Sequence, residues 1–159
     1  MKALVVTASN RAASGVYEDR SGPVLTALLE DAGCTVTGPR VVPDGPPVRE
    51  ALRAGIAEGF DVIVSTGGTG LTPGDLTPEM TRPLLDREIP GIAEAIRAYG
   101  ADKVPAAVLS RGVAGVVGAT LIVNLPGSTG GVRDGMAVLA PILGHALDQI
   151  RGGDHPRRT

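Results

Sequence analysis

The sequence predicts an α/β fold of three layers, in which a mostly parallel sheet with one antiparallel edge pair carries helices on both faces. Short apolar runs alternate along the 159 residues with segments whose apolar residues recur at helical spacing. The apolar share is 43 %, yet there are only two Tyr, one Phe and no Trp. The core must therefore be built from Val, Leu, Ile and Ala, as in helices packed on a parallel sheet.

The first half of the chain contains three expected strands and two expected helices. Residues 3–8 (ALVVTA) form a buried strand, and a helix follows over about 23–33. A second strand over 35–42 precedes a helix over 48–59, in which apolar residues recur every four positions. Residues 61–65 (DVIVS) are apolar without alternation, which is typical of a central parallel strand.

The second half continues the alternation with a change at one edge. We expect Thr77 to be the N-cap of a short helix, because Pro78 follows it. Another helix is expected over 90–100, and strands over 106–110 and 120–125. The glycine-rich connection between these two strands is short, so it predicts an antiparallel pair. A long helical pattern then runs to about residue 150.

Length and charge limit the organisation and the partners. The length fits one domain over residues 1–150, followed by a flexible tail over 151–159. The net charge is -2 with both signs mixed along the chain, so no basic field favours nucleic acid or an anionic membrane. The single Cys34 excludes an intramolecular disulfide. No apolar stretch approaches the roughly 18 residues that span a bilayer, and we expect a cytoplasmic protein.

Two glycine-bearing loops follow expected strands. The first reads STGGTGLTPGDLTPE (65–79) and the second reads PGSTGG (126–131). In an open parallel sheet, ligands bind at the carboxyl ends of the strands, and a helix N-terminus beyond such a loop favours an anion. The first loop lacks the lysine of a P-loop and the third glycine of a dinucleotide fingerprint. A phosphate-bearing ligand is the functional interpretation, and tight turns are the structural alternative.

Two aspartates strengthen the functional interpretation. Asp44 follows the second strand and Asp75 follows the glycine loop, so a parallel sheet would place both at one edge. Carboxylates repel a phosphate unless a cation lies between them, and Mg²⁺ commonly bridges one or two carboxylates and substrate phosphates. Each aspartate alone is explained equally well as a turn or cap residue. Together with two anion loops, they predict a Mg²⁺-dependent phosphate site.

Six stretches, in order and nearly end to end, give the chain a specific family resemblance. They are ASNRAASGVYEDRSGP, VVPDG, STGGTGLTPGDLTPE, REIPGIAEAIR, LSRGVAG and LIVNLPGSTGGVRDGM. The chain resembles the MogA/MoaB family of molybdenum-cofactor biosynthesis proteins, which includes the plant Cnx and gephyrin G domains. The resemblance implies a molybdopterin-binding fold that assembles as a homotrimer and makes transient contact with other proteins of the pathway. It also implies a reaction, in which Mg-ATP adenylylates the terminal phosphate of molybdopterin and pyrophosphate is released.

The resemblance also implies roles for individual residues. Asp44 and Asp75 match the functional aspartates, so both are candidates for catalysis and for Mg²⁺ binding. The candidates for binding molybdopterin or ATP lie in three segments: Thr66, Gly67, Gly68, Thr69, Gly70 and Glu79; Ser110 and Arg111; and Pro126, Gly127 and Ser128. In phosphoryl-group transfer a protein mainly positions ligands and stabilises charge, which suits backbone donors, a cation and an arginine.

Two departures from the family pattern keep other functions open. The family commonly has Ser-Asp-Arg where this chain has Asn10, and often has a basic residue where this chain has Gly74. Loss of a positive charge beside a triphosphate weakens its binding by about a kcal/mol. The alternative is therefore a catalytically weak or inactive molybdopterin carrier. A scaffold is the third class, for which the sequence offers no appended interaction segment.

Overall fold

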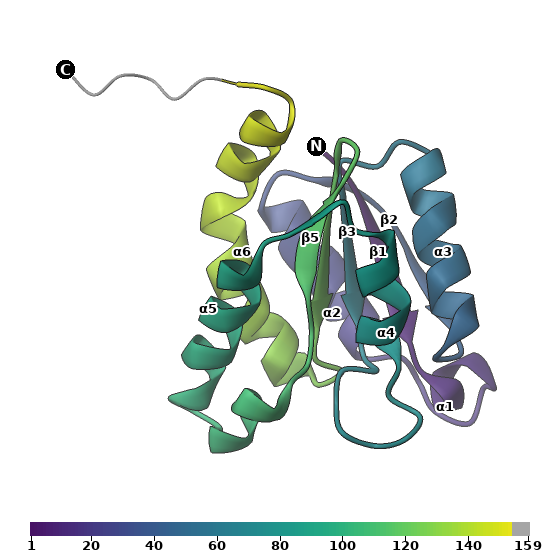
Figure 1. Ribbon diagram of the computed structural model, residues 1–159. Helices are drawn as coiled ribbons and strands as arrows, with labels where there is room; N and C mark the ends of the chain where they lie inside the picture. The colour runs from purple at the N-terminus through teal and green to yellow at the C-terminus, as the bar shows by residue number, and fades with distance from the viewer. Residues whose placement is uncertain (154–159) are drawn as a thin grey trace.

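The computed structural model describes residues 1–153, and a six-stranded sheet forms its centre (Figure 1). The strand order is β2-β1-β3-β6-β5-β4. The strands β2, β1, β3 and β6 are parallel, whereas β5 runs antiparallel to β6 and to β4. The predicted mixed sheet with an antiparallel edge is thereby confirmed. The bounds of the strands are β1 Lys2–Ala8, β2 Thr35–Val42, β3 Val62–Thr66, β4 Arg87–Glu88, β5 Ala114–Val117 and β6 Thr120–Leu125.

Helices cover both faces of this sheet (Figure 1). The helices α2, α5 and α6 pack on one face, and α3 with the short α4 packs on the other. Their bounds are α1 Asn10–Ala13, α2 Ser21–Asp31, α3 Pro46–Ala57, α4 Thr77–Thr81, α5 Pro90–Ala101 and α6 Thr129–Ile150, with 3₁₀ turns η1 Arg82–Leu84 and η2 Pro105–Leu109. The predicted tail is described only to Gly153, and the remainder of that prediction lies outside the described residues.

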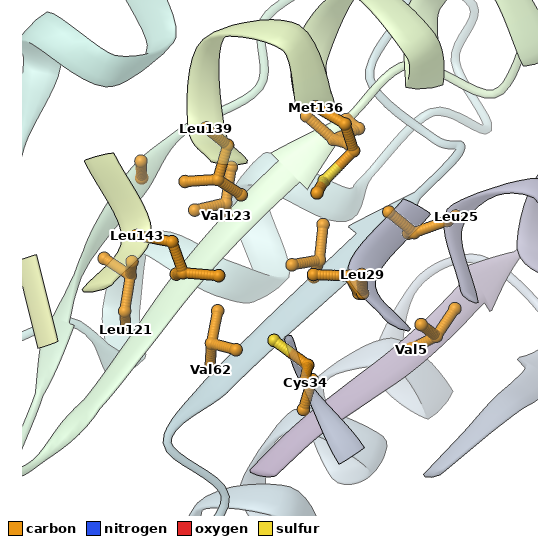
Figure 2. Packing of buried hydrophobic residues seen from close by; sticks show 14 of the residues in the cluster. Val5, Leu25, Leu29, Cys34, Val62, Leu121, Val123, Met136, Leu139 and Leu143 are labelled. Atoms are coloured by element: carbon orange, nitrogen blue, oxygen red, sulfur yellow. The ribbon is translucent and has the colours of Figure 1, made fainter. Parts of the chain in front are cut away.

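The core consists of two aliphatic layers separated by the sheet. Successive residues of a strand point to opposite faces, so Val5 of β1 packs with Leu25 and Leu29 of α2, while Leu4 faces the layer that contains Leu52 of α3. Figure 2 shows the first layer, where leucines of α6 lie over β3 and β6. Both faces are buried, which explains why the central strands are apolar without alternation.

The expected strand over 106–110 is wrong. Residues 105–109 form the 3₁₀ turn η2, and the antiparallel partner of β6 is β5. Pro105 has no N–H for a strand ladder, and Val108 and Leu109 are exposed. Gly115 of β5 lies very close to β4. A Cβ on this residue would come within 2.4 Å of the Arg87 carbonyl oxygen, so only glycine fits here. The small residues that resembled a connection therefore allow close approach of an edge strand.

The expected cap of α4 is displaced by one residue. Leu76 is the N-cap, and Thr77 is already helical. No side chain caps this helix; Thr77 is fully buried, and its N–H donates to the Gly68 carbonyl oxygen at 3.0 Å. This bond ties the start of α4 to the glycine loop, so the short helix belongs to the architecture of the loop.

Candidate functional site

A polar hollow of about 690 Å³ lies at the carboxyl ends of β1 and β3. Figure 1 shows the loop after β3 at the same end of the molecule as α1. The hollow is lined from β1 and α1, from the segment that carries Asp44, from the loop that carries Asp75, and from the start of α6. The topology thus brings together two aspartates that are distant in sequence, as the parallel sheet predicted.

The glycine loop adopts a conformation that side chains disfavour. Gly67 has a φ of 94° and Gly68 a φ of 69°, both in the left-handed region. A Cβ on Gly67 would lie 2.2 Å from the Ala8 carbonyl oxygen of the neighbouring strand. Gly127 of the second loop packs against Gly67, because a Cβ on it would lie 3.2 Å from the Gly67 Cα. Both predicted glycine loops therefore meet at one point.

Several backbone donors at this point have no acceptor. Among the residues that the structure describes, the N–H groups of Gly68, Thr69 and Gly70 make no hydrogen bond, and neither do those of Thr129 and Gly130 at the start of α6. Ser128 caps α6, with its hydroxyl accepting the Gly131 N–H at 3.0 Å. Free N–H groups beside a helix N-terminus favour an anionic group, so the geometry suits a phosphate.

Asp44 is half-buried and held by the backbone on both sides. Its Oδ1 accepts the Gly45 N–H at 2.7 Å and the Leu76 N–H at 3.3 Å. Its own N–H donates to the Asn10 Oδ1 at 3.0 Å. Burial raises the pKa of Asp44, and the negative charge of Asp75 raises it further, while the two backbone hydrogen bonds lower it. A cation would relieve both causes of the rise.

Asp75 presents one carboxylate oxygen to ligands. Its Oδ2 accepts the Thr72 N–H at 3.0 Å and the Thr72 hydroxyl at 2.7 Å. Its Oδ1 accepts no hydrogen bond from any residue between 1 and 153. Asp75 lines the polar hollow and also a second one, so a ligand in either hollow can reach this residue.

The second hollow has a different character. Its volume is about 850 Å³, and it extends from the glycine loop to η2. Apolar residues dominate one side, namely Leu71, Val104, Ala106, Ala107 and Leu109. Lys103 and Asp134, which form an ion pair of 2.7 Å, also line it. The two hollows share Gly68, Asp75, Gly127 and Ser128.

The remaining predicted residues divide into two groups. Thr66 lines the first hollow, and its hydroxyl donates to the Pro126 carbonyl oxygen at 2.7 Å. Ser110 and Pro126 line the second hollow, together with Thr69 and Gly70. Glu79 and Arg111 line neither of these hollows; they form an ion pair with each other.

Sequence reasoning missed Asp19, which also lines the polar hollow. Its Oδ1 accepts the Gly22 N–H at 2.9 Å, and its Oδ2 accepts the Thr7 hydroxyl at 2.9 Å. Aspartates often accept a backbone N–H of the first helical turn about three residues later. This sequence signal could have identified Asp19. Asp19 therefore fixes α2 against the end of β1 and carries a further negative charge into the hollow.

The carboxylates fit a cation that keeps part of its water shell. No group of three or more His, Cys, Asp or Glu side chains able to hold a metal occurs within residues 1–153. The Thr77 Oγ1 is buried beside Asp44, and a Cβ on Gly68 would meet both this oxygen and the Asp44 Oδ2 within 2.3 Å. Oxygen ligands from one or two carboxylates suit Mg²⁺ bound with substrate phosphates.

Replacing Asp44 by Asn is expected to stabilise the protein at neutral pH. Because the folded pKa is raised, the contribution of Asp44 to stability is greatest below its ordinary pKa and is lost as pH rises through the folded pKa. An amide does not ionise, and its oxygen can keep the bonds to Gly45 and Leu76. The variant should melt about 1–3 °C higher at pH 7.5, with the difference shrinking towards pH 4. A lower Tm than wild type at pH 7.5 would contradict this account of Asp44.

Comparison with known proteins identifies the family to which the chain belongs. The model of a family described as "Probable molybdopterin binding domain" matches residues 4–145. The chain belongs to this MogA/MoaB family of molybdenum cofactor biosynthesis proteins. The structure of a molybdopterin biosynthesis Mog protein from Mycobacterium ulcerans has 55 % identity and a TM-score of 0.89, over 94 % of this chain and 98 % of that one.

Two curated relatives show what the MogA/MoaB family includes. A protein named molybdopterin adenylyltransferase from Helicobacter pylori is 34 % identical, over 93 % of this chain and 86 % of that protein. A molybdenum cofactor biosynthesis bifunctional protein from Chlorobaculum tepidum is 38 % identical, over 95 % of this chain and 49 % of that protein. The chain therefore spans about half the length of such bifunctional relatives.

Among the described residues, no helix is both long and apolar enough to cross a membrane.

Proposed function

We propose that this protein adenylylates the terminal phosphate of molybdopterin with Mg-ATP. The observation that carries the proposal is the meeting of two hollows at Gly68, Asp75, Gly127 and Ser128. Transfer between two substrates requires two adjoining sites, and these two hollows adjoin beside unpaired N–H groups. The kinship with a protein named molybdopterin adenylyltransferase supports this choice of reaction.

The reaction needs positioning more than an activated nucleophile. A terminal phosphate oxygen of molybdopterin attacks the α-phosphorus of ATP, a new P–O bond forms, and the bond to the departing pyrophosphate breaks. The phosphate nucleophile is already ionised near neutral pH, so no general base is required. The N–H groups of Gly68, Thr69 and Gly70 are placed to stabilise the charge that develops on the transferred phosphorus group.

Asp44 and Asp75 would hold Mg²⁺ in this proposal. Both carboxylates line the polar hollow, and the Oδ1 of Asp75 accepts no hydrogen bond from the residues described. When bound, the ion neutralises charge on the phosphates and orients them. The protein's own contribution is to hold the two carboxylates, through Gly45 and Leu76 at Asp44 and through Thr72 at Asp75.

The alternative function is a carrier that binds molybdopterin without transfer. Asn10 and Gly74, the two departures from the family pattern, favour it. The structure weakens the first argument, because the Asn10 Oδ1 accepts the Asp44 N–H as an aspartate oxygen would. Gly74 lines the polar hollow and offers no charge there. The carrier therefore rests chiefly on Gly74.

Restoring a positive charge at this position is expected to strengthen nucleotide binding. Gly74 is exposed, its φ is not in the left-handed region, and a Cβ there would meet no atom within 4 Å. Gly74→Lys should lower the Kd of Mg-ATP about three- to tenfold at low ionic strength, and this gain should fall as salt rises. Gly74→Ala is the matched control. An equal gain from the alanine would show that charge is not the cause.

Separate titrations distinguish the enzyme from the carrier. Molybdopterin and Mg-ATP would each be titrated into the purified protein by calorimetry. The adenylyltransferase is expected to bind both ligands, whereas the carrier binds only the pterin and a scaffold binds neither. Binding of the pterin alone would overturn the proposal in favour of the carrier.

The proposal extends to assembly. The resemblance implies a homotrimer and transient contact with other proteins of molybdenum cofactor synthesis. Light scattering of the purified protein tests the first part, because a trimer has three times the mass of the 16.1 kDa chain. A monomer at micromolar concentration would remove the trimer from the proposal without affecting the reaction.

A further inference from the structure

Arg111 touches the loop of Asp75 at both of its ends. The residue lies between η2 and β5, and it lines a third hollow rather than either of the two that contain Asp75. We propose that Arg111, paired with Glu79, is a positioning residue that clamps residues 69–76 and so sets where the Asp75 carboxylate lies. This inference rests on the proposed function for its catalytic consequence, and on the contacts alone for the clamp.

At the start of the loop, Arg111 makes two contacts. Its backbone N–H donates to the Thr69 carbonyl oxygen at 2.8 Å, and its Nε donates to the Gly70 carbonyl oxygen at 2.8 Å. The neighbouring Ser110 hydroxyl adds a longer bond of 3.4 Å to the Thr69 hydroxyl. These bonds engage the carbonyl groups of Thr69 and Gly70, while the N–H groups of the same residues have no acceptor among the described residues.

At the end of the loop, the guanidinium makes the remaining contacts. Its Nη2 donates to the Asp75 carbonyl oxygen at 2.7 Å, and its Nη1 forms an ion pair with Glu79 in α4. Hydrogen bonding from Arg111 lowers the pKa of Glu79, which favours the ionised carboxylate. A rigid fork of donors suits this geometry, because one planar group reaches two peptide carbonyls and a carboxylate.

The segment between these contacts has little else to hold it. Residues 71–74 are exposed and lie outside helix and strand. Inside the loop, Thr72 binds the Asp75 Oδ2, so the carboxylate moves with the loop. Arg111 is itself braced from α5, where the Arg97 Nη1 donates to the carbonyl oxygens of Ser110 at 3.3 Å and Gly112 at 3.2 Å. The clamp therefore connects the Asp75 loop to the packed body of the fold.

The test compares Arg111→Met and Arg111→Lys with a matched pair elsewhere. Arg40 and Glu58 form a bidentate ion pair with side chains 32 % and 47 % exposed, against 34 % and 46 % for Arg111 and Glu79. Arg40→Met thus removes an equivalent pair that does not touch the loop. Amide hydrogen exchange would be measured on each protein without ligand, followed by kcat for adenylylation and the Kd of Mg-ATP and of molybdopterin.

Arg111→Met is expected to speed exchange within residues 69–76 about tenfold or more at the hydrogen-bonded amides of Thr72, Asp75 and Leu76, because local opening of the loop no longer has to break the clamp. Its kcat should fall about tenfold to a hundredfold because Asp75 is misplaced, while the Kd of molybdopterin changes less than about threefold. For Arg111→Lys, the exchange rate and kcat should lie between those of wild type and Arg111→Met, since a single ammonium cannot replace the planar guanidinium. Arg40→Met should leave exchange over 69–76 and kcat unchanged.

Unchanged exchange over 69–76 in Arg111→Met would overturn the clamp. Unchanged exchange with a much larger Kd for Mg-ATP would make Arg111 a substrate contact instead. Exchange requires no turnover, so the two proposals fail separately. If wild type forms no adenylylated pterin but Arg111→Met still speeds exchange, the clamp stands and the proposed function falls.

Discussion

Asp75→Asn is expected to reduce adenylyl transfer about 10³-fold while leaving the fold intact. The amide oxygen can keep the hydrogen bonds from Thr72, so the loop should hold its shape. The substitution removes the negative charge of Asp75, which lines both hollows. We expect the Tm to stay within about 2 °C of wild type and the Kd of molybdopterin to change little.

Asp86→Asn provides the control for this experiment. Asp86 is exposed, and its Oδ2 accepts the Gly118 N–H at 2.7 Å, so it also holds a turn, but it lines neither of the two hollows. The same substitution there should leave turnover unchanged. Turnover by Asp75→Asn within tenfold of wild type would remove Asp75 from the chemistry, whatever the behaviour of the control.

Gly67→Ala is expected to destabilise the protein by about 3–5 kcal/mol. The φ of 94° is costly for alanine, and the added Cβ would lie 2.2 Å from the Ala8 carbonyl oxygen. Neither atom can yield easily, because Ala8 ends the buried strand β1 and Gly67 follows the buried strand β3. A loss of this size should lower the Tm by about 10 °C or more. Denaturant unfolding would give the free energy directly.

Gly74→Ala in the same loop should change stability by less than about 0.5 kcal/mol. Its φ is not in the left-handed region, and no atom lies within 4 Å of the added Cβ. The comparison separates a glycine required by the turn from one that is merely exposed. Equal losses at both positions would show that the loop tolerates no side chain at all, which the geometry contradicts.

Most of the sheet could be predicted from the sequence, because strands that are buried on both faces are continuous apolar runs. The strands β1, β2, β3 and β6 coincide with the expected runs to within a residue or so. The antiparallel edge pair was predicted correctly, but one of its two strands was placed at residues 106–110 instead of β5. Gly115 in β5 admits the close backbone of β4, so small residues there looked like a connection, while the apolar Val108 and Leu109 are exposed in η2.

The site was predictable as far as topology determines it. Strand ends of a parallel sheet share an edge, so Asp44, Asp75 and both glycine loops could be brought together from order alone. The side on which Arg111 lies depends on how η2 packs, which has no local signature in the sequence. The second hollow was missed for the same reason, since it is bounded by residues of η2 that were assigned to a strand.

The most direct test of the adenylyl transfer uses ATP labelled at one phosphorus at a time. Purified protein, molybdopterin and Mg²⁺ would be incubated with ATP labelled at the α- or the γ-phosphate, and the pterin product isolated. The account predicts that the α-label appears in the pterin, in a one-to-one ratio with released pyrophosphate, and that the γ-label does not. Failure of the α-label to enter the pterin, in a protein shown to be folded and to bind molybdopterin, would contradict it.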